Sequence, residues 1–280
     1  MIAVGTCAWS YDDWRGVFYP EHLPPGDRLA FYAQHFPAVE IDSTFYHAPA
    51  AHVTAHWAEV TPPGFRFAAK VPREITHERK LRDCAGLVDE FTAGLAPLGE
   101  KLAAALLQLP PSFHVRHDES ALRDFIRHLP DTVRWAVEFR DPAWHLPRIA
   151  HLLEEHRVCW AWGDVTPPER ANEAAFGFWP HTTDFLYVRL LGDLEAKYRP
   201  DGSRRHIYRE LQWPRTVALE NWAEKIRALA APASLVFAAN HYEGFAPQTA
   251  ARFCEVIGLP AQLPTHDELT GGDPRQMGLL

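Results

Sequence analysis

Long hydrophobic runs are absent from this sequence of 280 residues. The longest uninterrupted apolar run, Leu102 to Leu107, is only as long as a β-strand, whereas a membrane-spanning helix needs about 20 apolar residues. The hydrophobic content of 47% is still enough for a full core, which excludes disorder and collagen-like repeats. We therefore expect a soluble globular protein with no membrane partner.

Cysteine is also scarce. The four cysteines, Cys7, Cys84, Cys159 and Cys254, lie far apart and include no C-x-x-C pair. Met1 leads directly into an apolar strand-like run, without the basic and apolar stretch of a secretory signal. We expect a cytoplasmic protein whose thiols are free, because disulfides are rare in a reducing compartment.

Positive charge is in short supply. The 28 basic residues are outnumbered by 36 acidic ones, which gives a formal net charge of -8, and only five of the basic residues are lysines. Such a surface repels phosphate backbones, so nucleic acid should bind at most weakly and any anion site must be local. No metal or other cofactor is expected, and the oligomeric state is left open.

Eight strand-like segments are present instead, and most are near-continuous apolar runs. That pattern is typical of parallel strands that are covered on both faces. The runs are Ile2 to Trp9, Ala38 to Phe45, Phe65 to Val71, Lys101 to Leu109, Arg134 to Phe139, Val158 to Asp164, Phe185 to Gly192 and Leu235 to Asn240.

Helical periodicity fills most of the gaps between these runs, as in the segment with Leu29, Tyr32 and Phe36. Alternation of eight strands with helices in about 260 residues favours a single α/β domain, a (β/α)8 TIM-type barrel. A Rossmann sheet is disfavoured because no G-x-G-x-x-G motif follows the first strand. We place the barrel at residues 1–264, with an irregular sixth crossover at Thr166 to Pro180 and a loosely ordered tail at residues 265–280.

The predicted strand ends carry polar residues, although a barrel interior normally takes apolar ones. Catalysis in such barrels takes place at the carboxyl ends of the strands, so these side chains should line one upper cavity. Ion pairs that only brace the barrel, such as Lys70 with Glu40 or Glu138, are the alternative for any single residue. The candidates for binding a substrate are Glu40, Arg73, His77, Gln108, Arg140, Arg189, Asn240, His241, Trp9 and Tyr46, and those for catalysis are Glu138, Asp164 and Lys70.

Three kinds of chemistry fit these residues. Glu138 and Asp164 lie on neighbouring predicted strands and could act as general acid and base. A metal could use these two carboxylates with His77 and His241, but no H-x-H or H-E-x-x-H spacing supports it. A buried Lys70 with a lowered pKa could form a Schiff base, although bracing by a salt bridge suits it better.

A local anion site is the further hypothesis. Lys70, Arg73, Arg140 and Arg189 could together hold a carboxylate or a phosphate, because the planar guanidinium group makes bidentate contacts. The acidic loops that follow the seventh and eighth strands disfavour the phosphate position found in many barrels. The anion pocket should therefore be central and made of side chains.

The strand-end motifs, taken together, resemble the YecE-like family, a domain of unknown function. The resemblance spans residues 2 to about 255, implies a single TIM-type barrel with a site at its top, and supplies no reaction. It matches Glu138, Arg140, Lys70, Arg189, Asn240 and His241, whereas Cys7-Ala8, Leu191, Asp193 and Ala239 depart from the family pattern. The motifs are G-T-C-A-W-S-Y-D-D-W, V-E-I-D-S-T-F-Y, K-V-P-R-E-I-T-H, L-L-Q-L-P-P-S-F, E-F-R-D-P-A-W, Y-V-R-L-L-G-D and A-N-H-Y-E-G-F-A.

The sequence as a whole indicates an enzyme, a hydrolase that acts on a small polar or anionic substrate. Glu138 and Asp164 would be its acid and base, and Lys70, Arg140 and Arg189 would orient the anion. Two alternatives stay open. One is a binding protein without catalysis, and the other is a metal-dependent nuclease or a sugar-phosphate isomerase-like enzyme.

Overall fold

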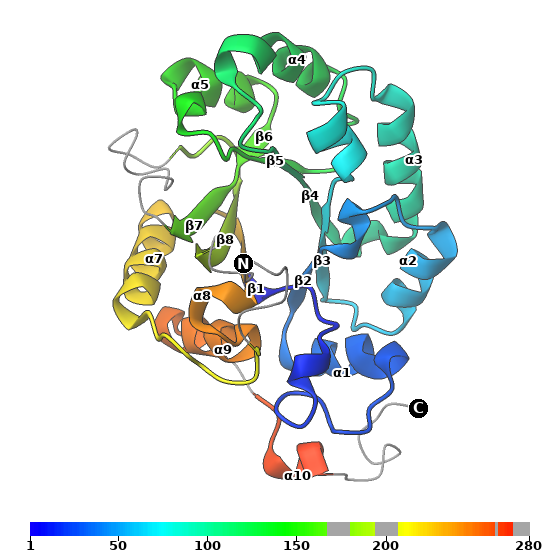
Figure 1. Ribbon diagram of the computed structural model, residues 1–280, viewed down its shortest axis with the longest axis vertical. Helices are drawn as coiled ribbons and strands as arrows, with labels where there is room; N and C mark the ends of the chain where they lie inside the picture. The colour runs from blue at the N-terminus through cyan, green and yellow to red at the C-terminus, as the bar shows by residue number, and fades with distance from the viewer. Residues whose placement is uncertain (167–179, 194–206, 261–262, 271–280) are drawn as a thin grey trace, which may run out of the picture.

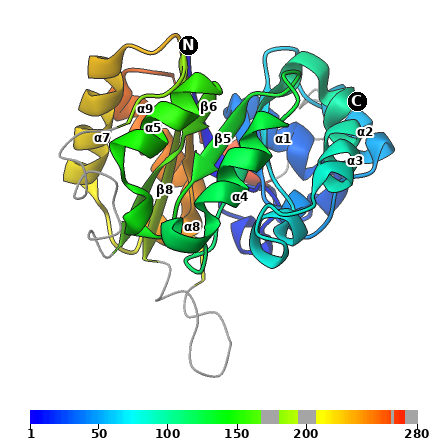
Figure 2. The same cartoon turned by 90° about the horizontal axis from the view of Figure 1, so that it is seen from above.

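The computed structural model describes residues 1–166, 180–193, 207–260 and 263–270, and these form a ring of parallel strands with helices outside it (Figures 1 and 2). The strands are hydrogen-bonded in the order β6-β5-β4-β3-β2-β1-β9-β8-β7. They are β1 (Ile2–Cys7), β2 (Ala38–Ile41), β3 (Arg66–Lys70), β4 (Leu102–Gln108), β5 (Trp135–Glu138), β6 (Val158–Trp160), β7 (Trp162–Thr166), β8 (Phe185–Asp193) and β9 (Ala233–Ala238).

The two edge strands of this order, β6 and β7, are consecutive in the chain and separated only by Ala161. The predicted sixth strand is therefore one run that changes its neighbour. Its first part pairs with β5, and the backbone N–H of Ala161 still donates to the carbonyl of Val137 at 2.8 Å, whereas its second part pairs with β8. The predicted TIM-type barrel is confirmed in this nearly closed form.

The seam between β6 and β8 is closed by a side chain. The backbone N–H of Trp160 donates to Thr182 Oγ1 at 2.8 Å, and the same hydroxyl donates to the carbonyl of Val158 at 2.7 Å. One buried threonine thus replaces two hydrogen bonds of a strand ladder, which leaves no orphaned backbone group at these two positions.

The helices cover the outside of the ring with their apolar faces. In α4, for example, Leu122, Phe125 and Ile126 are buried, as their spacing on one helix face predicts. The helices are α1 (Arg28–His35), α2 (Ala51–Glu59), α3 (Ala85–Leu95), α4 (Val115–Arg127), α5 (Pro147–Glu155), α7 (Thr216–Leu229), α8 (Asn240–Glu243), α9 (Ala246–Ile257) and α10 (His266–Thr270). None of these helices is long and apolar enough to cross a membrane.

The interior of the barrel is filled unevenly. Strands β3, β4 and β5 contribute the small residues Ala68, Ala104 and Ala136, whereas β8 and β9 contribute the aromatic rings of Tyr187 and Phe237, which lie 5.4 Å apart. Small side chains on one wall leave volume that apolar layers normally occupy. Polar side chains at the strand ends occupy that volume.

Two features of the prediction fall wholly or partly outside the described residues. The irregular sixth crossover lies mostly at residues 167–179, which the structure does not describe. The predicted tail contains the short helix α10, and residues 271–280 lie outside the described part. All four cysteines are buried and free, as expected.

The seam generates a test of stability. Thr182→Val keeps the shape of the side chain but leaves the N–H of Trp160 and the carbonyl of Val158 without their partner, so the free energy of unfolding should fall by about 1–3 kcal/mol. Chemical denaturation measures it. Thr183→Val is the control, because its half-buried hydroxyl donates to the Phe185 carbonyl and makes no hydrogen bond to the backbone of Val158 or Trp160. Equal effects of the two substitutions would contradict a closing role for Thr182.

Candidate functional site

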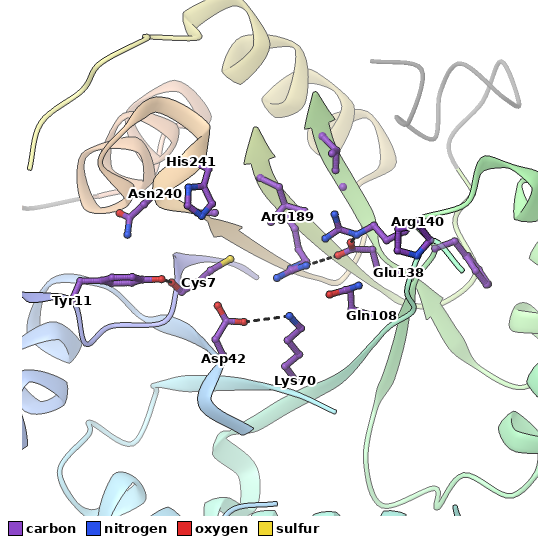
Figure 3. A pocket seen from close by; sticks show the side chains of 16 residues that line it. Cys7, Tyr11, Asp42, Lys70, Gln108, Glu138, Arg140, Arg189, Asn240 and His241 are labelled. Carbon is purple, nitrogen blue, oxygen red and sulfur yellow. Dashed lines mark hydrogen bonds and ion pairs between the residues drawn. The ribbon is translucent and has the colours of Figure 1, made fainter. Parts of the chain in front are cut away.

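A cavity of about 370 Å³ opens at the carboxyl ends of the strands (Figure 3). Its wall combines charged groups from β3 and from the end of β5 with neutral polar groups from β1 and α8, which is the end of the barrel where a site is expected. The lining residues are Cys7, Tyr11, Asp42, Lys70, Gln108, Pro111, Glu138, Phe139, Arg140, Gly163, Val165, Arg189, Leu191, Ala239, Asn240 and His241.

Arg189 lies at the floor of the cavity and joins two buried carboxylates. Its Nε and Nη2 atoms donate to the two oxygens of Glu40 at 2.9 and 2.7 Å, and Nη1 donates to Glu138 Oε2 at 2.5 Å. The hydroxyl of Tyr187 also donates to Glu40, at 2.6 Å. Period-2 alternation positions this cluster, since Tyr187 and Arg189 share the inner face of β8.

The charges of this cluster stabilise one another. Burial alone raises the pKa of Glu138, but Arg140 and Arg189 outweigh that effect and hold the pKa below its ordinary value of 4.5. Burial alone lowers the pKa of Arg189, but Glu40 and Glu138 reverse that effect, so the pKa of the guanidinium is well above its ordinary range. Glu138 is therefore ionised at neutral pH and does not suit the predicted role of a proton donor.

Two predictions are corrected by this geometry. Every nitrogen atom of Arg189 already donates to a carboxylate, so Arg189 braces the floor and is not a main anchor for an anion. Glu138 is held by Arg189 on one oxygen and forms an ion pair with Arg140 on the other. Glu138 and Arg189 therefore form ion pairs that brace the barrel, which is the alternative for single residues. The cation that pairs with Glu40 and Glu138 is Arg189 and not Lys70.

Lys70 and Arg140 differ from Arg189 because their donors are largely unused. Lys70 Nζ is 3.9 Å from Asp42 Oδ1 and 4.1 Å from the centre of the Phe45 ring, and it makes no hydrogen bond to any residue that the structure describes. Arg140 is engaged through Nε, and its Nη atoms donate to no described residue. Only 13% and 14% of these side chains are exposed, so both cations are held at the cavity wall.

Burial lowers the pKa of Lys70, and the carboxylate of Asp42 opposes this effect only in part. Burial likewise lowers the pKa of Arg140, and Glu138 opposes that effect. A bound anion would stabilise the charged form of such a buried cation, because its negative charge compensates for the hydration that burial removes. The anion hypothesis therefore rests on Lys70 and Arg140.

Asp164 does not reach the cavity. Gly163 and Val165, on either side of Asp164, line the cavity. Because side chains alternate along a strand, that of Asp164 lies on the helix side of β7. There Asp164 Oδ2 accepts hydrogen bonds from Trp222 Nε1 and the Tyr242 hydroxyl, both at 2.7 Å. The predicted acid and base pair of Glu138 and Asp164 is wrong in geometry.

Five predicted binding residues lie outside the lining of the cavity. Glu40 is fully buried beneath it, against Arg189. Arg73 is half exposed and forms an ion pair with Glu78 at 3.1 Å. Trp9 packs edge-on against Trp57, and Tyr46 is 68% exposed. His77 belongs to a π-helical turn, Glu74–Glu78, that follows β3.

The electrostatics of His77 are set by its burial and by the nearby cationic wall. Burial is the largest cause that lowers the pKa, and the positive charges of Lys70, Arg73 and Arg140 add to it, so the pKa is about 4. His77 is therefore neutral at pH 7. Its ring also contacts that of Phe45, which in turn faces Lys70.

The other predicted binding residues, Gln108, Asn240 and His241, do line the cavity. Gln108 Nε2 donates to the carbonyl of Leu109 at 3.1 Å. The Tyr208 hydroxyl lies 2.7 Å from His241 Nδ1 and fixes the orientation of the imidazole.

The site residues listed from the sequence do not include Cys7, Tyr11 and Asp42, which line the cavity, or Tyr187, which is part of its floor. Cys7 ends the first strand, and the sequence indicates no more than a free thiol at this position. Asp42 follows Glu40 on the same face, and Tyr187 precedes Arg189 by two positions, so the alternation that found Glu40 and Arg189 also indicates these two.

The hypothesised metal ligands do not come together in the described part of the chain. Within residues 1–166, 180–193, 207–260 and 263–270, no group of three or more His, Cys, Asp or Glu side chains has an arrangement that could hold a metal ion. The hypothesised set of Glu138, Asp164, His77 and His241 is not assembled, since Asp164 faces the helices.

The fold and the cavity define the class of protein, a single TIM-type barrel with a charged, polar site at the carboxyl ends of its strands. The family described as "Protein of unknown function DUF72" matches residues 3–271, and the chain belongs to this family. The resemblance found in the strand-end motifs is thereby confirmed.

Relatives from several bacteria share parts or all of the chain. The UPF0759 protein YecE of Escherichia coli (strain K12) is 36% identical over 142 residues, which are 51% of this chain and 49% of that protein. The match thus spans about half the length of that relative. The UPF0759 protein YunF of Bacillus subtilis (strain 168) is 26% identical over 297 residues and covers 100% of both proteins.

A crystal structure of a DUF72 family protein from Thermotoga maritima MSB8 is also similar. It is 28% identical, has a TM-score of 0.75, and covers 92% of this chain and 99% of its own. A DUF72 family protein from Enterococcus faecalis V583, at 22% identity and a TM-score of 0.74, has the same fold.

The floor of the cavity predicts a large loss of stability for Arg189→Met. The substitution leaves the buried carboxylates of Glu40 and Glu138 without their shared cation, so the free energy of unfolding should fall by about 3–5 kcal/mol. Chemical denaturation measures it, with Arg79→Met as control, since Arg79 pairs with Glu74 at the surface. A similar small loss in both variants would refute the bracing role.

The lowered pKa of Glu138 predicts a pH dependence. Folding lowers the pKa of the Glu138 carboxyl below its ordinary value of 4.5. The ionised carboxylate therefore stabilises the folded protein at pH values above 4.5, and this stabilisation is lost as the pH falls from 4.5 through the lower pKa of the folded state. The difference in unfolding free energy between the unmodified protein and Glu138→Gln should therefore shrink as the pH falls below 4.5. A difference that stays constant between pH 7 and strongly acidic pH would contradict this linkage.

Proposed function

We propose that this protein is an enzyme that hydrolyses a small anionic substrate, one that bears a phosphate or a carboxylate, in the cavity at the top of the barrel. The observation that carries the proposal is the pair of Lys70 and Arg140, two largely buried cations whose donors, apart from Nε of Arg140, are not used by the described residues. Charge-assisted hydrogen bonds from an ammonium and a guanidinium suit both kinds of anion.

The chemistry is assigned to residues other than the predicted carboxylate pair. His241 acts as general base toward water, since its imidazole lines the cavity and the Tyr208 hydroxyl orients it. Lys70 stabilises the charge that develops on the substrate and can donate a proton to the leaving group, because burial lowers its pKa. Glu40, Arg189 and Glu138 hold the floor beneath them.

A binding protein without catalysis is the second candidate. The specific observation in its favour is that the carboxylates of Glu40 and Glu138 satisfy Arg189, so the strongest charges of the site are committed to structure. This candidate shares the anion pocket with the first. The cytoplasmic location expected from the cysteine content applies to both.

Binding of inorganic phosphate tests the pocket. Lys70→Met should weaken the affinity measured by calorimetry at least tenfold, because it removes a charge-assisted contact of about 1.5–3 kcal/mol. Lys80→Met is the matched control, since Lys80 lies outside the lining of the cavity and donates to the Ser112 carbonyl. Equal affinity in both variants would remove the anion pocket from the proposal.

Substitution of His241 separates the enzyme from the binding protein. His241→Gln should lower turnover about 100-fold or more on a panel of phosphate and carboxylate esters, since general base catalysis contributes at least that much, and should leave phosphate affinity near that of the unmodified protein. If no ester on the panel is turned over while phosphate binds, the non-catalytic candidate replaces the enzyme.

A further inference from the structure

The amide of Asn240 has a fixed orientation. Its Oδ1 atom accepts hydrogen bonds from the indole Nε1 of Trp14 at 3.2 Å and from the backbone N–H of Ala246 at 2.9 Å. Both partners can only donate, so an amide turned the other way would set its own N–H groups against two donors. Nδ2 is therefore the atom that remains for other contacts.

Among the described residues, that nitrogen has no hydrogen-bond partner. Asn240 is only 3% exposed and lines the cavity, yet Nδ2 donates to none of the residues that the structure describes. A buried N–H donor without an acceptor costs about 1–3 kcal/mol. The Oδ1 atom accepts a hydrogen bond from the first residue of helix α9 and another from Trp14, so these contacts give the oxygen a structural role. They give no role to the nitrogen.

Asn240 lies across the barrel mouth from the two cations. It follows β9, which is next to β1 in the ring, whereas Lys70 ends β3 and Arg140 follows β5. Figure 3 shows Asn240 with Tyr11 and His241 on one side of the cavity and Lys70 with Arg140 on the other. A ligand that uses both sides must reach across the cavity.

We infer that Asn240 forms a second subsite, which accepts an uncharged hydrogen-bond acceptor of the substrate while Lys70 and Arg140 hold its anionic group. The inference rests on the proposed function and narrows the substrate class. The substrate is a small molecule with a phosphate or carboxylate at one end and a hydroxyl or carbonyl oxygen at the other. An anion without that oxygen leaves Nδ2 unpaired and binds more weakly.

Asn240→Asp tests the subsite with little change of shape. Aspartate keeps the oxygen that Trp14 and Ala246 require but replaces the donor with an acceptor. The probes are alkyl phosphates of increasing chain length and the matching hydroxyalkyl phosphates, measured by calorimetry. The ratio of the two affinities is the readout, because the added negative charge weakens both probes alike. Asn221→Asp, at an exposed position of α7, is the control.

At the length that spans the cavity, the hydroxyl should improve affinity about tenfold in the unmodified protein and in Asn221→Asp. In Asn240→Asp this gain should disappear, with the melting temperature close to that of the control. A gain that survives Asn240→Asp, or no gain at any chain length, would overturn the subsite while the phosphate pocket stands.

Failure of the anion pocket, on which both candidate functions rest, gives a different result. In that case inorganic phosphate does not bind to the unmodified protein at all. Crystals soaked with glycerol then decide the subsite by itself. A glycerol oxygen on Nδ2 of Asn240 supports it, and the absence of glycerol from this position overturns it.

Discussion

The contact of Arg189 with Glu40 and Glu138 is the interaction on which the upper half of the barrel depends. It joins β8 to β2 and β5 across the interior, where apolar side chains would otherwise meet. Buried charges of this kind are costly unless each is paired. Three mutually satisfied groups meet that condition, and Tyr187 supplies a further hydrogen bond to Glu40.

This paired floor separates structural charge from charge that can act on a ligand. Since Arg189 is committed, the cations that face the cavity are Lys70 and Arg140, and both lie on the wall formed from β3 to β5. The opposite wall is neutral and polar, with Asn240 and His241. The site therefore has a direction, with charge recognition on one side and hydrogen bonding on the other.

The barrel and much of its site could be predicted from the sequence because both depend on local pattern. Apolar runs of strand length and alternation within them placed Glu40, Lys70 and Arg189 on the inner face. The prediction failed at Asp164 because it followed the position of this residue at a strand end and not the alternation, which puts Ala161, Gly163 and Val165 on the inner face and Asp164 on the helix side. The sequence also could not show that Arg189, and not Lys70, is the cation neutralised by Glu40. That pairing depends on the distance between side chains more than 100 positions apart in the chain.

The seam at Thr182 has a consequence for fluctuations of the native barrel. Neighbouring strands elsewhere in the ring are joined by repeated backbone ladders, whereas β6 meets the β8 side through one hydroxyl and through Cys159 Sγ, which donates to the Phe185 carbonyl at 3.4 Å. Local opening starts where few hydrogen bonds must break. The ring can thus open locally between β6 and β8 while the ladders between its other strands stay intact. The amide proton of Trp160 would then exchange with solvent before the amide protons of those ladders.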